Sequence, residues 1–212
     1  MKERPILFST LMVKSILTGQ KTQTRRVIKP QPICEKFSAF IGGYDNIPKL
    51  ARFWIPDKSG NNNPLIEDIK CPYDQNLWVR ETWQHTKCLN LHPSDENYGY
   101  IYKASDNGKE FESNFEEWRW KPSIFMPKDA CRIRLEIADV RVERLQDISE
   151  DDAKAEGIVQ NNIPHEGWYW LEHVYSTNSA VLAFERLWDS INFKRAPWES
   201  NPWTWVITFK KQ

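Results

Sequence analysis

The run LTGQKTQTRR, residues 17–26, decides the fold that we expect, because it closes a helix and opens a strand. Before it, PILFS at residues 5–9 is typical of a short buried strand, and apolar residues then recur at helical spacing through Leu17. Gly19 predicts the end of that helix, since glycine readily takes the left-handed conformation that follows many helix C-termini. The β-branched residues after Gly19 favour a strand. The chain is therefore expected to open with a strand, a helix and a second strand.

The same run contains a possible reactive group of side chains in the spacing Gly19-x-Lys21-x-x-Thr24-x-Arg26. In a continuous strand, Lys21 and Thr24 are three residues apart and point to opposite faces. They converge only if the chain is still turning between Gly19 and Lys21. In that case burial and the charge of Arg26 lower the pKa of Lys21, and a neutral Lys21 can deprotonate the Thr24 hydroxyl. The alternative is a solvated basic strand with β-branched threonines.

The middle of the chain alternates between irregular segments and short strands. Many Pro, Gly and Asn residues predict irregular structure and a long surface insertion from about residue 30 to 76. LWVRETW (77–83) and YGYIYKA (98–104) predict strands, and residues 105–130 predict a loop with at most one helical turn. A long alternating strand is predicted over residues 131–145, with a bulge or a bend near Ala138-Asp139, where the apolar phase changes.

Two helices and a strand are predicted near the C-terminus. Ser149 suits an N-cap, acidic residues fill the next turn, and Gly157 closes the helix. Glu156 then lies in the last turn, where a carboxylate is unfavourable for the helix dipole, which hints at another role. Residues 178–191 predict the clearest amphipathic helix, and WTWVITFKK (203–211) predicts a closing strand. The order of elements indicates one α+β domain over residues 1–212, with a mostly antiparallel barrel or sheet flanked by helices.

Composition narrows the possible partners and the location. The chain has 29 basic and 29 acidic residues, so it lacks the global positive field that drives tight binding to long nucleic acid. No apolar run approaches the roughly 20 residues of a membrane span, and MKERPILFST does not resemble a signal peptide. We expect a cytoplasmic protein that binds neither membrane nor DNA.

Metal binding is not expected from the cysteines and histidines. Their spacing contains no C-x-x-C and no histidine at ligand distance, so free thiols and isolated histidines are predicted, without metal or cofactor. The residues are Cys34, Cys71, Cys88, Cys131, His85, His92, His165 and His173.

The run LTGQKTQTRR, the strand LWVRETW and the late strand-helix-strand block resemble the ASCH domain of the PUA-like superfamily, in a long form common in phage-related and bacterial genomes. The resemblance implies a PUA-like, mostly antiparallel β-barrel with flanking helices and insertions at about 30–76 and 105–130. The usual family signature is G-x-K-x-x-E-x-R, and this chain has Thr24 in place of the glutamate. With threonine at this position, the motif resembles that of small bacterial ASCH enzymes that hydrolyse the amide of N(4)-acetylcytidine.

This resemblance implies three catalytic residues. Thr24 matches the nucleophile, Lys21 the base, and Glu156 the proton relay, the last because ISEDDAKAEGI (148–158) aligns with the enzymes' helix without gaps. Arg26 is then a stabiliser of the oxyanion or an anchor for substrate, or else a structural partner of Glu81, which we favour.

Aromatic and basic side chains complete the expected substrate site. Trp78, Trp83 or Tyr102 can supply a stacking wall for a base, although core packing is the commoner role of any one of the 11 tryptophans. The residues predicted to bind the substrate are Arg25, Arg26, Trp78, Glu81 and Trp83.

Three other functions stay open at this point. In a non-catalytic RNA-binding module, the basic residues of the motif would clamp a phosphate. In a ribonuclease, Lys21 and Arg26 would act as base and phosphate stabiliser. In a phage-encoded interaction protein, the insertions would bind a protein partner that the sequence does not identify. The expected ligand of an amidohydrolase, an RNA-binding module or a ribonuclease is a nucleoside or RNA.

Overall fold

The computed structural model describes residues 3–33, 36–44, 47–55, 65–73, 76–86, 99–105, 119–160, 168–170, 173–175 and 179–212. Its centre is a five-stranded sheet in the order β1-β6-β9-β13-β2, in which only the β1–β6 pair is parallel. The strands are β1 (Arg4–Leu7), β2 (Gln23–Val27), β6 (Asn76–Arg80), β9 (Arg134–Arg144) and β13 (Trp203–Lys211). This confirms the predicted α+β class. Among the described strands β1 and β2 are the two edges, so the expected barrel is not closed.

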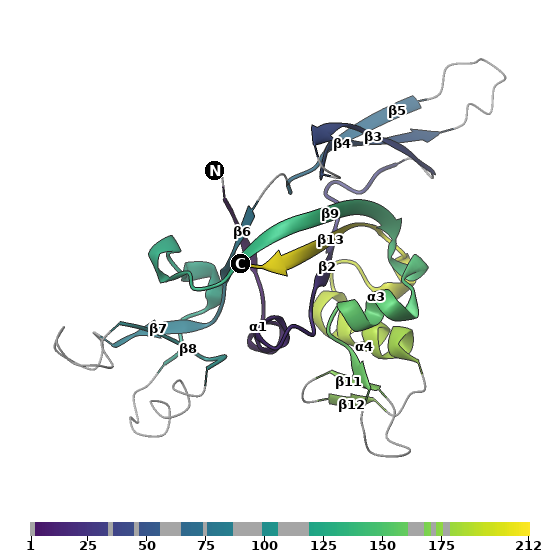
Figure 1. Ribbon diagram of the computed structural model, residues 1–212. Helices are drawn as coiled ribbons and strands as arrows, with labels where there is room; N and C mark the ends of the chain where they lie inside the picture. The colour runs from purple at the N-terminus through teal and green to yellow at the C-terminus, as the bar shows by residue number, and fades with distance from the viewer. Residues whose placement is uncertain are drawn as a thin grey trace.

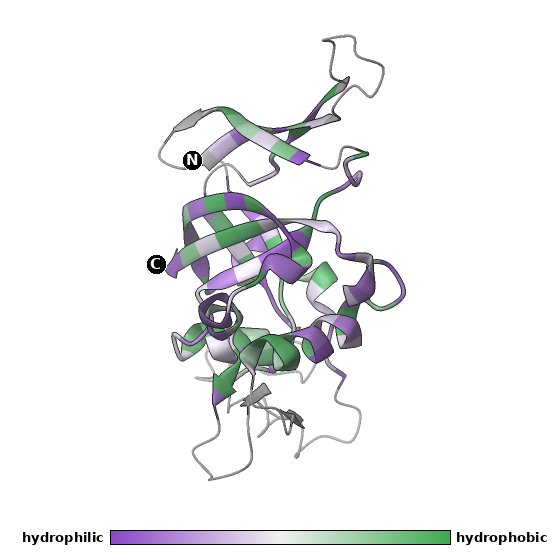
Figure 2. Ribbon diagram, turned by 90° about the vertical axis from the view of Figure 1, so that its right-hand side faces the viewer, coloured by the Kyte–Doolittle hydropathy of each residue, from purple (hydrophilic) through white to green (hydrophobic). Residues whose placement is uncertain are grey.

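The bulge predicted in the long strand is present in β9. Asp139 pairs with Thr208, whereas the next residue of β13, Phe209, pairs with Ile137, so Ala138 is the extra residue. The bulge allows Ile137 and Val140, three residues apart, both to be buried in the core. Figure 2 shows hydrophobic and hydrophilic residues alternating along the strands of this sheet.

In the described part of the chain three α-helices flank the sheet, and each begins at a serine N-cap whose hydroxyl accepts from a backbone amide. Helix α1 spans Thr10–Leu17, α3 spans Glu150–Ala155 and α4 spans Ala180–Asn192. Figure 1 shows α3 and α4 side by side near β2, in agreement with their contacts. Gly19 (φ 77°) and Gly157 (φ 103°) follow α1 and α3 in the left-handed conformation, as predicted.

The apolar residues form two main clusters that these helices help to close. One lies on the central sheet and includes side chains of α1, such as Val13 and Ile16. The other lies between α3 and α4 and includes Ala153, Phe184 and Leu187. No helix among the described residues combines the length and the apolar character needed to span a membrane.

The prediction of irregular structure over residues 30–76 is wrong. The described part of this segment forms a three-stranded antiparallel sheet of β3 (Lys36–Tyr44), β4 (Ile47–Ile55) and β5 (Leu65–Lys70). Figure 1 shows this sheet above β9, and contacts link β4 to β9. Phe53 is buried against Trp203 with ring centroids 5.3 Å apart. The Pro and Gly residues mislead because several lie at strand ends or between strands, where they do not interrupt the ladder.

Short elements make up the rest of the described chain. The strand predicted at 77–83 divides at Glu81 into β6 and β7, and the strand predicted at 98–104 is reduced to β8. Two 3-10 turns occur at Ser123–Phe125 and Lys128–Ala130, whereas residues 106–118 of the predicted loop lie outside the described residues. The remaining strands are β7 (Trp83–His85), β8 (Tyr100–Tyr102), β10 (Val159–Gln160), β11 (Trp168–Trp170) and β12 (His173–Tyr175).

Candidate active site

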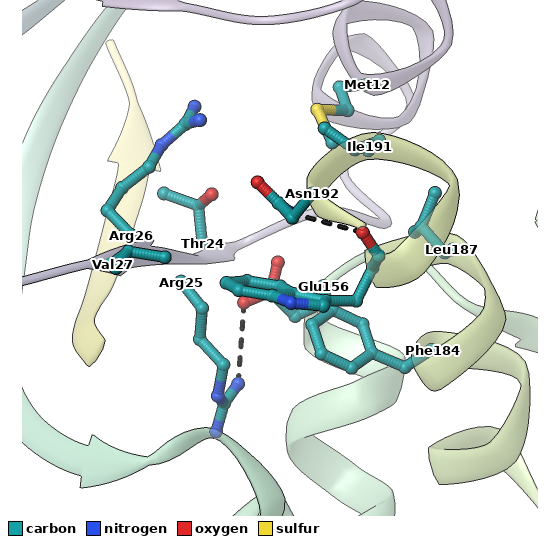
Figure 3. A pocket seen from close by; sticks show the side chains of 11 residues that line it. Met12, Thr24, Arg25, Arg26, Val27, Glu156, Phe184, Leu187, Ile191 and Asn192 are labelled. Carbon is teal, nitrogen blue, oxygen red and sulfur yellow. Dashed lines mark hydrogen bonds and ion pairs between the residues drawn. The ribbon is translucent and has the colours of Figure 1, made fainter. Parts of the chain in front are cut away.

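A pocket opens between β2 and α4, next to the end of α3 (Figure 3). Its polar wall comes from β2 and from Glu156, and its apolar wall comes mainly from α4. The cavity volume is about 70 Å³, several times the roughly 10–15 Å³ that one water molecule requires. The lining residues are Met12, Thr24, Arg25, Arg26, Val27, Glu156, Phe184, Leu187, Trp188, Ile191 and Asn192.

Lys21 lies in the turn between α1 and β2, and its side chain is directed to the end of α3. Its backbone amide donates to Ser15 O at 3.0 Å, so the chain is still turning here, and β2 begins only at Gln23. The Lys21 ammonium donates to Glu156 Oε2 at 2.7 Å and to the Glu156 carbonyl at 2.8 Å. Lys21 is 2% exposed. The turning chain that the sequence required for convergence is therefore present.

Gly157 permits this close approach of Lys21 to the end of α3. A Cβ at Gly157 would lie 3.3 Å from Ser15 Oγ and 3.5 Å from Lys21 Cβ. Its φ of 103° is also one that L-residues rarely adopt. Glycine here thus satisfies a backbone and a packing requirement at once.

Glu156 is held from its other side by a network of ion pairs. Its Oε1 lies 3.4 Å from Arg25 Nη1, while Arg25 Nη2 contacts Glu143 at 2.9 Å and Asp152 at 3.1 Å. Arg141 binds the same two carboxylates. The network therefore contains three cations (Lys21, Arg25 and Arg141) and three carboxylates (Glu143, Asp152 and Glu156), and its formal charge is zero.

Burial and charge change the acidity of two groups in this network. Burial lowers the pKa of Lys21 below its ordinary value, and the positive charges of Arg26 and Arg25 act in the same direction, against the opposing effect of Glu156. Burial acts to raise the pKa of Asp152, but the hydrogen bond from Arg141 and the charges of Arg25 and Arg141 outweigh it, so that pKa is lowered. Lys21 thus loses its proton more readily than a solvated lysine.

Thr24 lies on the pocket wall with Glu156 and is 3% exposed. It is the second residue of β2 and pairs with Ile207 of β13, which fixes its position in the sheet. Figure 3 shows Thr24 and Glu156 on the same pocket. Of the three residues predicted to act together, Lys21 and Glu156 are in contact, and Thr24 and Glu156 line one cavity.

The predicted ion pair between Arg26 and Glu81 is wrong. Arg26 Nη2 donates to the Leu7 carbonyl at 2.6 Å, and its guanidinium carbon lies 5.2 Å from the centre of the Phe8 ring. Glu81 instead accepts two hydrogen bonds from Arg132, each at 2.8 Å. The reason is the strand order, since β9 and β13 separate β6, which leads to Glu81, from β2.

Neither Trp78 nor Trp83, from which a stacking wall was predicted, lines this pocket. Trp78 is buried and lies under the Arg80 guanidinium at 4.8 Å. Trp83 belongs to a separate cluster with Met126. Tyr102, another residue considered for the wall, donates to the Ala130 carbonyl at 2.7 Å.

The aromatic wall that the sequence analysis missed comes from α4. Phe184 and Trp188 line the pocket with ring centroids 6.1 Å apart, and Trp188 Nε1 donates to the Ala196 carbonyl at 2.8 Å. The helix itself was predicted correctly. An apolar stripe on a helix is compatible with a pocket wall and with core packing, so the sequence pattern does not distinguish the two. The stripe ends at the exposed Ile191 and the polar Asn192, where the pocket is open.

The described residues contain no group of three or more His, Cys, Asp and Glu side chains placed to hold a metal ion. Cys71 and Cys131 are free thiols, whereas Cys34 and Cys88 lie outside the described residues. His85 packs edge-on against Tyr100, and the side chains of the other histidines also lie outside the described part.

The pocket wall carries a hydroxyl (Thr24) and a carboxylate (Glu156) next to apolar side chains, and behind the carboxylate the buried Lys21 contributes an amine of lowered pKa. These groups suit nucleophilic attack with proton transfer on a small, partly aromatic ligand. Comparison with protein-family models, curated proteins and solved structures finds no match for this chain.

Proposed function

We propose that this protein is an amidohydrolase that removes the acyl group from the exocyclic amine of N(4)-acetylcytidine or a similar cytosine derivative. We further propose that it is a PUA-like protein of the ASCH family. The observation that carries the proposal is the buried Lys21–Glu156 pair at a pocket whose wall includes the Thr24 hydroxyl. Such a pair supplies both a proton acceptor and a relay beside a nucleophile.

The reaction would proceed through an acyl-enzyme. Thr24 Oγ1 attacks the amide carbonyl, and its proton passes to neutral Lys21. Glu156, hydrogen-bonded to Lys21 at 2.7 Å, helps to return the proton to the departing cytosine amine as the C–N bond breaks. Water then attacks the Thr24 ester, releases the carboxylic acid and restores the hydroxyl.

The pocket walls suit a cytosine derivative better than a long nucleic acid. Phe184 and Trp188 offer aromatic faces for a single base. The formal charge of the whole chain is zero, so there is no broad positive surface potential to hold a polyanion. A small ligand that enters one pocket is therefore favoured over an RNA duplex or strand.

The test is turnover of N(4)-acetylcytidine by the purified protein, with cytidine release followed by chromatography. We expect Thr24→Ala and Lys21→Ala to lower the rate by at least about 10²-fold, the scale of a lost nucleophile or base. Thr22→Ala is the matched control, because Thr22 is exposed in the same segment and does not line the pocket. Intact-protein mass spectrometry of slow-turnover samples should find an acetyl group on Thr24.

The proposal fails if folded protein, checked by circular dichroism, does not release cytidine. It also fails if Thr24→Ala retains the full rate, because another nucleophile or a directly activated water would then carry the reaction. RNA binding that weakens steeply with salt, without turnover, would indicate a binding module instead. Loss of an RNA-cleaving activity in Lys21→Ala would indicate a ribonuclease.

A further inference from the structure

Arg26 is the cation of the pocket wall that lies outside the neutral ion-pair network. With Lys21 protonated, the three cations and three carboxylates of that network cancel among themselves, and Arg26 has no part in these ion pairs. Among the described residues, no carboxylate lies within ion-pair distance of Arg26. Glu156 is the carboxylate on the same pocket, but its two oxygens bind Lys21 and Arg25.

The Arg26 guanidinium has hydrogen-bond donors to spare. It carries five N–H groups, and its one hydrogen bond to a described residue runs from Nη2 to the Leu7 carbonyl at 2.6 Å. Figure 3 shows Arg26 and Arg25 directed to opposite sides of β2, as expected for neighbours in a strand. Arg26 is therefore kept apart from the carboxylates that neutralise Arg25.

The pocket is more open at the end of α4 that carries Ile191 and Asn192 than at Phe184 and Trp188. Along α4 the exposed fraction is 3% at Phe184, 5% at Trp188 and 54% at Ile191. Thr24 is buried, whereas Arg26, two residues later on β2, is only partly buried. Because Thr24 and Arg26 are two residues apart on β2 and both line the pocket, a ligand whose acyl carbon reaches Thr24 can extend along the strand toward Arg26.

Asn192 adds a polar group at this open end. Its Nδ2 donates to the Trp188 carbonyl at 3.2 Å, which leaves the amide oxygen as an acceptor on the pocket side. A sugar hydroxyl is a suitable donor for it. The pocket wall thus offers an acceptor and a guanidinium without an ion-pair partner among the described residues, a combination that matches a sugar phosphate more closely than a neutral sugar.

We propose that Arg26 binds the 5′-phosphate of the ligand, and that the preferred substrate is an N(4)-acylated cytidine monophosphate and not the neutral nucleoside. This inference rests on the proposed function for the identity of the base and the acyl group. The phosphate is the anionic group of a nucleotide farthest from the reacting amide.

The kinetic test compares kcat/KM for N(4)-acetylcytidine and for its 5′-monophosphate. We expect the wild-type protein to prefer the monophosphate by at least about tenfold, the scale of one charge-assisted hydrogen bond. Arg26→Met should lose most of this preference through KM, and Arg26→Lys should retain part of it. Arg134→Met is the control, because Arg134 is exposed, pairs with Glu3 and does not line the pocket.

A binding measurement separates this inference from the proposed function. The Thr24→Ala variant is titrated calorimetrically with cytidine, cytidine 5′-monophosphate and inorganic phosphate. Tighter binding of the monophosphate than of cytidine, abolished by an added Arg26→Met change, supports the phosphate site even if no substrate is hydrolysed. Equal binding of cytidine and its monophosphate, or equal kcat/KM for the two acetylated compounds, overturns the inference while leaving the amidohydrolase intact. An equal loss of kcat for both compounds in Arg26→Met also overturns it, since Arg26 would then act on the transition state.

Discussion

Lys21 and Glu156 place opposite charges where water hardly reaches, with side-chain exposures of 1% and 4%. Removing a charge from water is costly, and the partner offsets the cost only while the pair is intact. The intact pair therefore adds little to the stability of the fold, whereas a substitution that removes one partner is strongly destabilising. Under the proposed function, the pair is retained for chemistry at the pocket that Glu156 lines.

Glu156→Gln should destabilise the protein by about 3–5 kcal/mol, because it leaves the buried Lys21 without its counter-ion. The change keeps the shape of the side chain, so packing is preserved. Urea unfolding monitored by tryptophan fluorescence measures the effect, with Glu199→Gln, at an exposed position, as control. A loss below about 1 kcal/mol would show that the pair is not buried as described.

The lowered pKa of Lys21 predicts a pH dependence of turnover. Only neutral Lys21 accepts the Thr24 proton, so kcat/KM should rise as pH increases through the pKa of Lys21. Because burial lowers that pKa, the rise should be centred below 10.5, the ordinary value for lysine. The pH–rate profile of the wild-type protein tests this. A profile with the same rise in Lys21→Arg, whose side chain stays charged, would assign the rise to another group.

At the scale of elements, the site depends on where α1 and α3 end. Each helix stops at a glycine of positive φ, and the two turns bring Lys21 and Glu156 together. Glu150 also connects α3 to α4, because its carboxylate accepts a hydrogen bond from the backbone amide of Ala180 in α4 at 2.8 Å. The apolar wall on α4 is thus held in place relative to the end of α3.

Gly157→Ala should destabilise the protein by about 1–3 kcal/mol, because the residue must keep a φ of 103° and the new methyl group meets Ser15 Oγ at 3.3 Å. Gly19→Ala is the matched control, since Gly19 has a φ of 77° but no atom within 4 Å of the place that a Cβ would take. Thermal unfolding should therefore show the larger loss for Gly157→Ala. Equal losses would mean that backbone strain alone matters.

At the scale of the whole molecule, the ion-pair network joins α3 to the sheet. Asp152 of α3 contacts Arg25 of β2 at 3.1 Å and Arg141 of β9 at 2.8 Å. These contacts cross three elements that are far apart in the chain. They also make the attachment of α3 dependent on pH.

Asp152→Asn should lower the melting temperature at pH 7, and the difference from the wild type should shrink as pH falls below the unfolded pKa of an aspartate. The pKa of Asp152 is lower in the folded state, so its contribution is fully present above the unfolded value of about 3.9 and is lost as pH falls through the folded value. Melting curves of both proteins across this range measure the difference. A difference that stays constant with pH would indicate lost packing and not lost charge. Asp151→Asn, at an exposed position of the same helix, is the control.

Local patterns in the sequence determined several features of this protein. The ends of α1 and α3, the Ser149 cap, the β9 bulge and the amphipathic α4 depend on residues close together in the chain, where periodicity and glycine placement act directly. These structural predictions are confirmed because their causes are local. The motif spacing also indicated Lys21 and Thr24, together with the condition of a turn before β2, and that turn is present.

Only the tertiary structure decided which distant groups meet. The central sheet stays open and residues 36–70 contribute a second sheet, since strand pairing depends on partners far along the chain. Glu81 pairs with Arg132 instead of Arg26, and α4 supplies the aromatic wall in place of Trp78 or Trp83. A side chain's type and spacing specify what it can do, whereas its burial and its partners are set by packing across the whole fold.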